Sequence, residues 1–354
     1  MFAAAACITA AVAVSCPACH AGESPYIYRG LRPMGMGGAF TAVSDDANAL
    51  FYNPAGLALV EKSIVSFFPL EMEISQKTLD MYGGARDVDF DSEQETAEFL
   101  RDHMGDQARI AFNLFPHYAR RRFAFGLIGT FRLDSEVHDR QYPRIGIHGV
   151  SDLGFCAGYA HPILEERLLV GASAKLVRRR SIAAEYSAAD IASENFDDAI
   201  HDDMKDGAGL LVDIGAVYRL DEAVRGLRAG ISMNNLVGSK MQDAEDMPAH
   251  VDVGLAFERD LGIVRATFAA DYVDVFSRFA GDDDPAKRVR LGAEVRFPAF
   301  VSVRAGFHQG YFTFGTTLDV WIARIDALTY AEETGAYAGQ KPDRRYAVNI
   351  GFGL

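Results

Sequence analysis

Four arginines and one glutamate occupy alternate positions on two neighbouring segments in the last third of the chain. Arg288, Arg290, Glu294 and Arg296 share one side of the first segment, and Arg304 lies on the next. A guanidinium group binds a carboxylate through two parallel hydrogen bonds, so this side could bind the headgroup of a hydrophobic acid. The same residues could instead form ion pairs across neighbouring strands. Such a ladder would hold together the β-barrel and the plug inside it that are predicted below. Both interpretations need a polar face that lipid does not touch.

The segments that carry these residues have the two-residue period of β-strands. Most are about 9 to 12 residues long, as expected for tilted strands that cross a bilayer, whereas a soluble sandwich would use shorter strands. The pattern predicts an all-β transmembrane protein, an outer-membrane barrel of about fourteen antiparallel strands. The predicted strands begin near Ser63, Gln107, Arg122, Val150, Arg167, Gly207, Gly226, His250, Gly262, Arg288, Phe300, Tyr311, Ala323 and Arg345.

The connections between these strands alternate in length, as extracellular loops and periplasmic turns do. Short turns are predicted at 119–121, 163–166, 221–224 and 260–261, and long polar loops at 77–106, 134–149, 177–206, 237–248, 276–286 and 332–344. Gln309-Gly310 is the exception, because it is short where the alternation expects a long loop. Asp87, Asp89, Asp91 and Glu98 have part of a calcium-loop spacing. Ser92 stands where that loop needs glycine and no helix pair is evident, so we predict a solvated loop.

Residues 1–21 are predicted to be a signal peptide. They contain no Asp, Glu, Lys or Arg, and Cys19-His20-Ala21 offers a cleavage site before Gly22. An uncleaved anchor and lipidation at Cys16 are the alternatives. Three of the four cysteines lie in this segment, so the mature chain would keep only Cys156 and form no internal disulfide.

Residues 22–62 do not read as a membrane strand. Glycines at 35, 37 and 38 allow close packing, and Ser44 or Asp45 could cap a short helix through Ala49. Asn53-Pro54-Ala55-Gly56 then ends it, because proline lacks an amide donor. Such short pieces fit a plug inside a barrel that spans 63–354, and a periplasmic lead-in is the alternative.

Three stretches of sequence in this segment resemble the N-terminal hatch of FadL-type outer-membrane proteins. They are Met36 to Val43, Asp45 to Ala47, and Tyr52 to Ala58 with its Asn-Pro-Ala signature. The last 70 or so residues, with RVRLGAEVRF, VSVRAGF and YAVNIGFGL, are similar to the PorV and PorQ branch. The resemblance implies a fourteen-stranded barrel blocked by a hatch, and it assigns a gating role to Asn53, Pro54 and Ala55. It also implies that the barrel binds hydrophobic molecules and releases them when the hatch moves.

Composition and motifs exclude several other functions. A formal charge of −14 and a pI near 5.1 argue against nucleic-acid binding. No hydrolase, zinc-protease or phosphate-loop motif is present in the predicted mature chain, so we predict neither an enzyme nor a cofactor or metal site. The predicted function is outer-membrane transport of long-chain fatty acids or other hydrophobic compounds. Expected partners are these molecules, outer-membrane lipids and the barrel-assembly machinery. The alternatives are a PorV-like secretion or surface-anchoring barrel that acts through protein partners, and a barrel retained mainly for envelope structure.

Overall fold

A computed structural model describes residues 25–86, 88–237, 240–279, 284–298 and 300–353. The predicted signal peptide therefore lies outside the described residues. Within the described ranges, no helix is long and apolar enough to cross a membrane.

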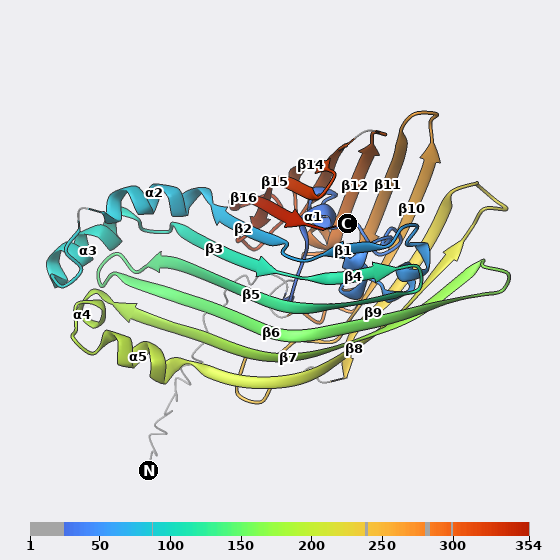
Figure 1. The fold of residues 1–354 in the computed structure, drawn as a ribbon. Helices are drawn as coiled ribbons and strands as arrows, with labels where there is room; N and C mark the ends of the chain where they lie inside the picture. The colour runs from blue at the N-terminus through green and yellow to red at the C-terminus, as the bar shows by residue number, and fades with distance from the viewer. Residues whose placement is uncertain (1–24, 87, 238–239, 280–283, 299, 354) are drawn as a thin grey trace, which may run out of the picture.

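Fourteen antiparallel strands form a closed barrel (Figure 1). Each strand pairs with its neighbour in sequence, β16 pairs with β2, and β5 pairs with both β3 and β6. The predicted strand number is thus confirmed. The strands are β2 Leu70–Ser75, β3 Gln107–Leu114, β5 Phe123–His138, β6 Arg144–Ile163, β7 Leu168–Ser187, β8 Lys205–Arg219, β9 Leu227–Val237, β10 His250–Asp260, β11 Arg265–Tyr272, β12 Val289–Arg296, β13 Val301–His308, β14 Tyr311–Val320, β15 Ala323–Glu333 and β16 Pro342–Phe352.

Strands β5 to β8 are longer than predicted, and β6 and β7 have 20 residues each. The ranges 134–149 and 177–206, which we predicted as loops, therefore belong partly to strands. Arg178, Arg179 and Arg180 are consecutive in β7, so both faces of the strand are charged there. The sequence therefore shows no alternation of apolar and polar residues that would predict a strand. A strand that continues beyond the membrane has no lipid to face, and the two-residue period of hydrophobicity disappears there.

The first two membrane strands are interrupted at the same level of the barrel wall. The segment β1 Ile64–Ser66 is separated from β2 by Phe67 to Pro69, and β4 His117–Arg120 is separated from β3 by Phe115 and Pro116. Pro69 and Pro116 cannot donate to a ladder, so the regular pairing stops at both prolines. Beyond this kink β1 pairs with β4 and β4 with β5.

Helices α2 Gln76–Ala85, α3 Glu93–Asp102, α4 Ala188–Ile191 and α5 Phe196–Asp203 cover the end of the barrel where the long loops lie (Figure 1). Ser75, Ser92 and Ser187 cap the first three through their hydroxyl groups. We predicted these segments as polar loops without a helix pair, and that prediction was wrong. Met81, Leu100 and Val137 pack together with Ala188 and give the helices a small core of their own.

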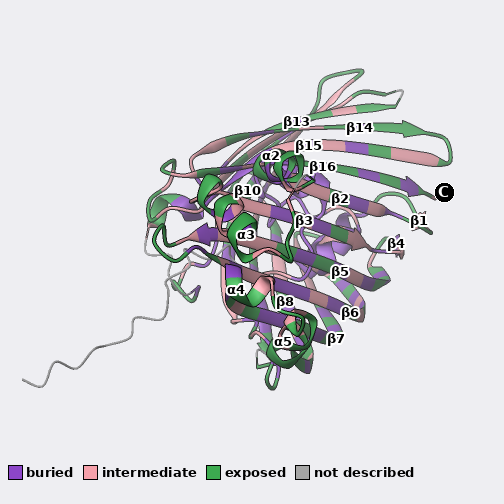
Figure 2. Ribbon diagram, turned by 90° about the vertical axis from the view of Figure 1, so that its left-hand side faces the viewer, coloured by how far each residue is buried: buried purple, intermediate pink, exposed green. Residues whose placement is uncertain are grey.

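Buried and exposed residues alternate along many of the strands (Figure 2), as expected when side chains point alternately inward and outward. Leu153, Phe155 and Leu176 are outward and exposed, whereas Arg179 and Asp152 are inward and fully buried as an ion pair with an N–O distance of 2.7 Å. An apolar exterior with charged pairs in the interior is the arrangement that a lipid environment requires.

Candidate functional site

A hatch of short helices fills the middle of the barrel. It contains α1 Leu31–Gly35 and two 3-10 helices, η1 Ala47–Leu50 and η2 Pro54–Leu59. The Asp46 side chain accepts a hydrogen bond from the Asn48 amide and so caps η1, where we had predicted Ser44 or Asp45 as the cap. Nearly every hatch residue from Ile27 to Val60 is buried, so the hatch is part of the barrel interior.

Asn53, Pro54 and Ala55 fix the hatch to the wall at β7 to β9. The Asn53 side chain caps η2 and donates to the carbonyls of Thr41 at 2.8 Å and of Ala216 and Ile231 at 3.3 Å. Two wall glycines permit this approach. A Cβ built at Gly215 would lie 1.9 Å from Asn53 Oδ1, and one at Gly171 would lie 2.5 Å from the Pro54 carbonyl.

The hatch is held by apolar packing on one side. Leu50, Leu57 and Val60 belong to a buried cluster with residues of β5 to β8, among them Ile128 and Cys156. Burying such side chains contributes about 1.5–3 kcal/mol each, so this side is the firm attachment of the hatch.

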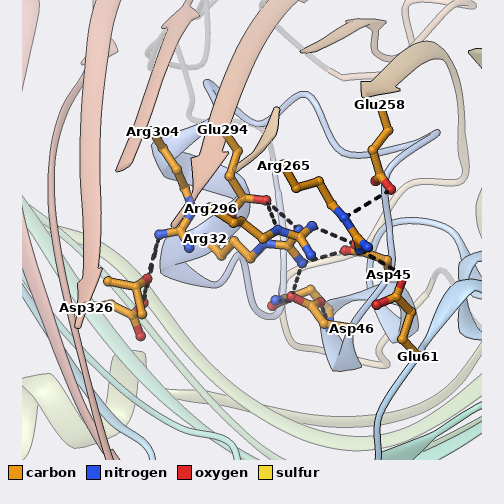
Figure 3. A network of polar contacts seen from close by, with 12 residues as sticks. Arg32, Asp45, Asp46, Glu61, Glu258, Arg265, Glu294, Arg296, Arg304 and Asp326 are labelled. Carbon is orange, nitrogen blue, oxygen red and sulfur yellow. Dashed lines mark hydrogen bonds and ion pairs between the residues drawn. The ribbon is translucent and has the colours of Figure 1, made fainter. Parts of the chain in front are cut away.

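The opposite side of the hatch is held by charge (Figure 3). Arg32 makes two hydrogen bonds to the carboxylate of Glu294 on β12, at 3.0 and 2.8 Å, and also contacts Asp45 and Asp46. Glu294 also accepts from Arg296 at 2.8 Å and from Arg304 on β13 at 2.7 Å. Arg296 contacts Asp45 at 2.7 Å. We call this group of six residues the ionic seam.

The charges of the ionic seam balance, with three arginines against Asp45, Asp46 and Glu294. Burial raises the pKa of Asp45, but Arg32 and then Arg296 outweigh that effect and hold the pKa well below its ordinary value. Asp45 is therefore an anion at any physiological pH, and the hatch side of the seam keeps its charge.

Further polar contacts join the hatch to the remaining wall. The backbone amides of Phe40 and Thr41 both donate to Asp271 on β11, at 2.7 Å each. Arg29 pairs with Glu332 on β15, which also contacts His308 Nε2 at 2.6 Å. These contacts lie between the apolar side and the ionic seam, so the hatch is attached all around the lumen.

The predicted lumenal arginines thus have different surroundings. Arg296 and Arg304 belong to the ionic seam, and Arg288 contacts Ser277. Arg290 has no hydrogen-bond or ion-pair partner among the described residues, and its Nε is buried without an acceptor. Asp271 lies opposite Arg290 on the neighbouring strand β11. One of its carboxylate oxygens accepts hydrogen bonds from the hatch amides of Phe40 and Thr41.

Three cavities follow one another through the lumen. An outer cavity of about 460 Å³ lies at the long-loop end between β3, β5, β6 and β7, and an inner cavity of about 500 Å³ lies between the hatch and the short-turn end. A central cavity of about 80 Å³ lies between them and is lined by Arg290, Tyr52 and Asn234. Pro25 and Tyr26 line both the outer and the central cavity, and Tyr28 lines both the central and the inner one.

The cavities differ in chemistry. The inner cavity meets the whole ionic seam together with Arg324 and Asp326, so it is polar. The outer cavity combines Ala108, Ile147, Ala183 and Ala184 with a charged rim. On that rim burial raises the pKa of Glu245, but a hydrogen bond from His148 and the charge of Arg132 lower it to about 2. Despite this charged rim, the outer cavity is the more apolar of these two cavities.

A family model described as "F plasmid transfer operon, TraF, protein" matches residues 141–319, just over half of the chain. The chain belongs to this family. The part matched in the TraF family model runs from the loop after β5 to β14, so it covers barrel wall and excludes the hatch. No curated protein matches the chain.

Solved structures show the fold of this TraF family member. The CymD monoaromatic hydrocarbon channel superposes with a TM-score of 0.52 at 15% identity, over 94% of this chain and 98% of that one. A FadL homologue of Pseudomonas aeruginosa gives 0.50 at 11% identity, over 93% and 98%. The predicted FadL-type outer-membrane barrel is therefore confirmed as a fold. The similarity of the last strands to PorV and PorQ stays a prediction.

Sequence reasoning missed the hatch partners of the lumenal arginines. Arg32, Asp45 and Asp46 are the charged residues of the otherwise uncharged, glycine-rich stretch 30–60. Because a buried charge needs a partner, their presence in a predicted plug could have indicated the seam. Which wall residues they meet depends on barrel closure, and no local pattern encodes that.

Proposed function

We propose that this barrel carries hydrophobic compounds across the outer membrane and that the hatch is its gate. The observation that carries the proposal is the row of three cavities on both sides of the hatch, in which the outer cavity at the long-loop end is more apolar than the inner one. Fold similarity to a hydrocarbon channel and a FadL homologue agrees with this cargo, although it speaks for the fold alone.

Long-chain fatty acids are the cargo we propose. The acyl chain would lie in the outer cavity, and the carboxylate would reach the central cavity, where Arg290 has no partner in the part of the chain that the structure describes. A charge-assisted bond to a carboxylate would satisfy this half-buried cation. Lipid molecules of the membrane and the barrel-assembly machinery are the remaining partners in the proposal.

For release, the hatch would move about the attachment at Asn53, Pro54 and Ala55. This attachment and the apolar cluster next to it stay in place, because their contacts are buried and close-packed. The ionic seam would part instead, since ion pairs exchange their partners for water when the inner cavity fills. Parting the seam would join the central and inner cavities.

Binding of a fluorescent long-chain fatty acid to the refolded barrel in detergent tests the proposal. We expect saturable binding that Arg290→Gln weakens, with unchanged binding of the corresponding long-chain alcohol. Arg178→Gln is the matched control, because Arg178 points outward. Absence of saturable binding to a barrel that resists heat-unfolding on a gel would refute fatty-acid transport.

The family match favours a second candidate function. Its description names a plasmid transfer operon, so a TraF family barrel could act with protein partners in the cell envelope, as in the predicted alternative. Cross-linking from the long loops in cells that carry a transfer operon, followed by identification of the adduct, would support it. Cross-links to lipid alone would count against it.

A further inference from the structure

The side chain of Tyr26 sits in a cradle of three arginines where the outer and central cavities meet. The guanidinium carbon of Arg29 lies 3.8 Å from the centre of the Tyr26 ring, and that of Arg132 lies 4.9 Å from it. Arg109 donates a hydrogen bond to the Tyr26 hydroxyl. The ring is thus recognised through its faces and its oxygen at the same time.

The arginines of this cradle are positioned without help from the Tyr26 side chain. Arg109 bonds Glu73 at 2.6 Å and Asp134 at 2.7 Å, and Arg29 pairs with Glu332. Arg132 bonds the backbone carbonyl of Tyr26 at 2.7 Å, which any residue at this position would offer. Removing the phenol ring would therefore leave a preformed site.

Tyr26 belongs to a segment fixed on one side. Ile27, Tyr28 and Arg29 are buried, and the Tyr28 hydroxyl contacts Glu71 on β2. Tyr26 itself is only half-buried and borders the two cavities, so its ring has space to rotate into the outer one.

We propose that Tyr26 is a built-in stand-in for the ligand and that the cradle binds aromatic compounds with a ring hydroxyl. A neutral electron-rich ring suits two guanidinium faces, and a hydroxyl oxygen suits the Arg109 donor. Asp134, Glu136 and Glu245 line the outer cavity, and their negative charges disfavour an anionic ligand there. Substituents on the ring would extend along Ala183 and Ala184. This inference rests on one part of the proposed function, namely that compounds from outside can enter the outer cavity.

The test compares 4-ethylphenol with ethylbenzene, which has the same skeleton without the hydroxyl. Binding to the full barrel in detergent is measured by equilibrium dialysis for wild type, Tyr26→Ala and Tyr26→Phe. Tyr142→Ala is the control, because Tyr142 is an exposed tyrosine at the same end. Tyr26→Ala removes the internal competitor, so 4-ethylphenol binds at least about tenfold more tightly, and ethylbenzene gains much less. Adding Arg132→Gln to this variant reverses the gain.

Equal gains for both compounds, or no gain, would overturn the cradle. If Tyr26→Ala does not migrate as a folded barrel, Tyr26→Phe gives the same comparison with a smaller gain, since only the hydroxyl contact is lost. Fatty-acid binding to the same samples separates the two proposals. A folded barrel that binds fatty acid but shows no gain refutes the cradle alone, and one that binds neither fatty acid nor aromatic compound refutes the proposed function.

Discussion

Replacing Glu294 by glutamine tests whether the ionic seam holds the hatch closed. The Glu294 side chain is 0% exposed and accepts hydrogen bonds from Arg32, Arg296 and Arg304. Without its charge, Arg32 and Arg296 would keep only Asp45 and Asp46 as anionic partners among the described residues, and Arg304 would keep only Asp326 at 3.9 Å. Removing one partner of a buried pair costs about 3–5 kcal/mol. Since about 1.4 kcal/mol is a factor of ten, the open population rises by about two to four orders of magnitude.

Single-channel recording in planar bilayers measures this change. Wild type should stay closed, and Glu294→Gln should show frequent openings while still migrating as a folded barrel on an unheated gel. Glu166→Gln is the control, because the Arg121–Glu166 pair is about half exposed and contributes only about 0–1 kcal/mol. Removing Arg32 as well should cost less than the sum of the single changes, because the two residues share one contact. A Glu294→Gln barrel with the open probability of wild type would refute the role of the seam.

Three further predictions follow from the same contacts. Gly215→Ala should lower the thermal stability of the folded barrel on gels, because its Cβ would lie 1.9 Å from Asn53 Oδ1, whereas Gly129→Ala has no neighbour closer than 3.7 Å and should not. Lowering the pH from 7 to 5 should leave the conductance of an Asp271→Asn barrel unchanged, because that variant removes the carboxylate at the Phe40 and Thr41 amides and leaves the ionic seam to hold the hatch. The depressed pKa of Asp45 means that its contribution to closure is complete above about 3.9 and is lost only below that pH; openings that begin between pH 7 and 5 would contradict this. Asp271→Asn should loosen the hatch less than Glu294→Gln in the same recordings, because an amide oxygen still accepts from Phe40 and Thr41.

The barrel could be predicted from sequence wherever strands meet lipid. Segments such as Arg288 to Phe297 alternate strictly because one face is apolar and the other lines a polar lumen. The pattern fails in β7 beyond Leu176, where Arg178 and Arg180 are outward and Arg179 is inward, so the strand looks like a polar loop. Helices α2 and α3 were missed for a related reason, since solvated helices over a barrel rim bury few side chains.

The Asn53-Pro54-Ala55 motif made the hatch recognisable in the sequence, but the contacts of the hatch with the barrel wall could not be predicted from it. Asn53 meets Ala216 and Ile231 on two strands more than 160 residues away, and Glu294 meets Arg32 across the closed lumen. Such pairs depend on strand order and on which end of the barrel the hatch enters. Residue types indicated that buried charges needed partners, while their identity required the three-dimensional structure.

Locking the hatch to the wall tests the central claim most directly. A Cβ built at Gly35 lies 3.4 Å from the Arg304 Cβ on β13, close to the Cβ–Cβ distance of about 3.5–4.5 Å in disulfides, so the pair Gly35→Cys and Arg304→Cys should form a disulfide between hatch and wall. In a Cys156→Ala background, cells that carry this variant would be assayed for uptake of a radiolabelled long-chain fatty acid. We predict that uptake is lost when the disulfide is oxidised and returns with a reducing agent. Uptake that is the same in both states would contradict the hatch as the gate.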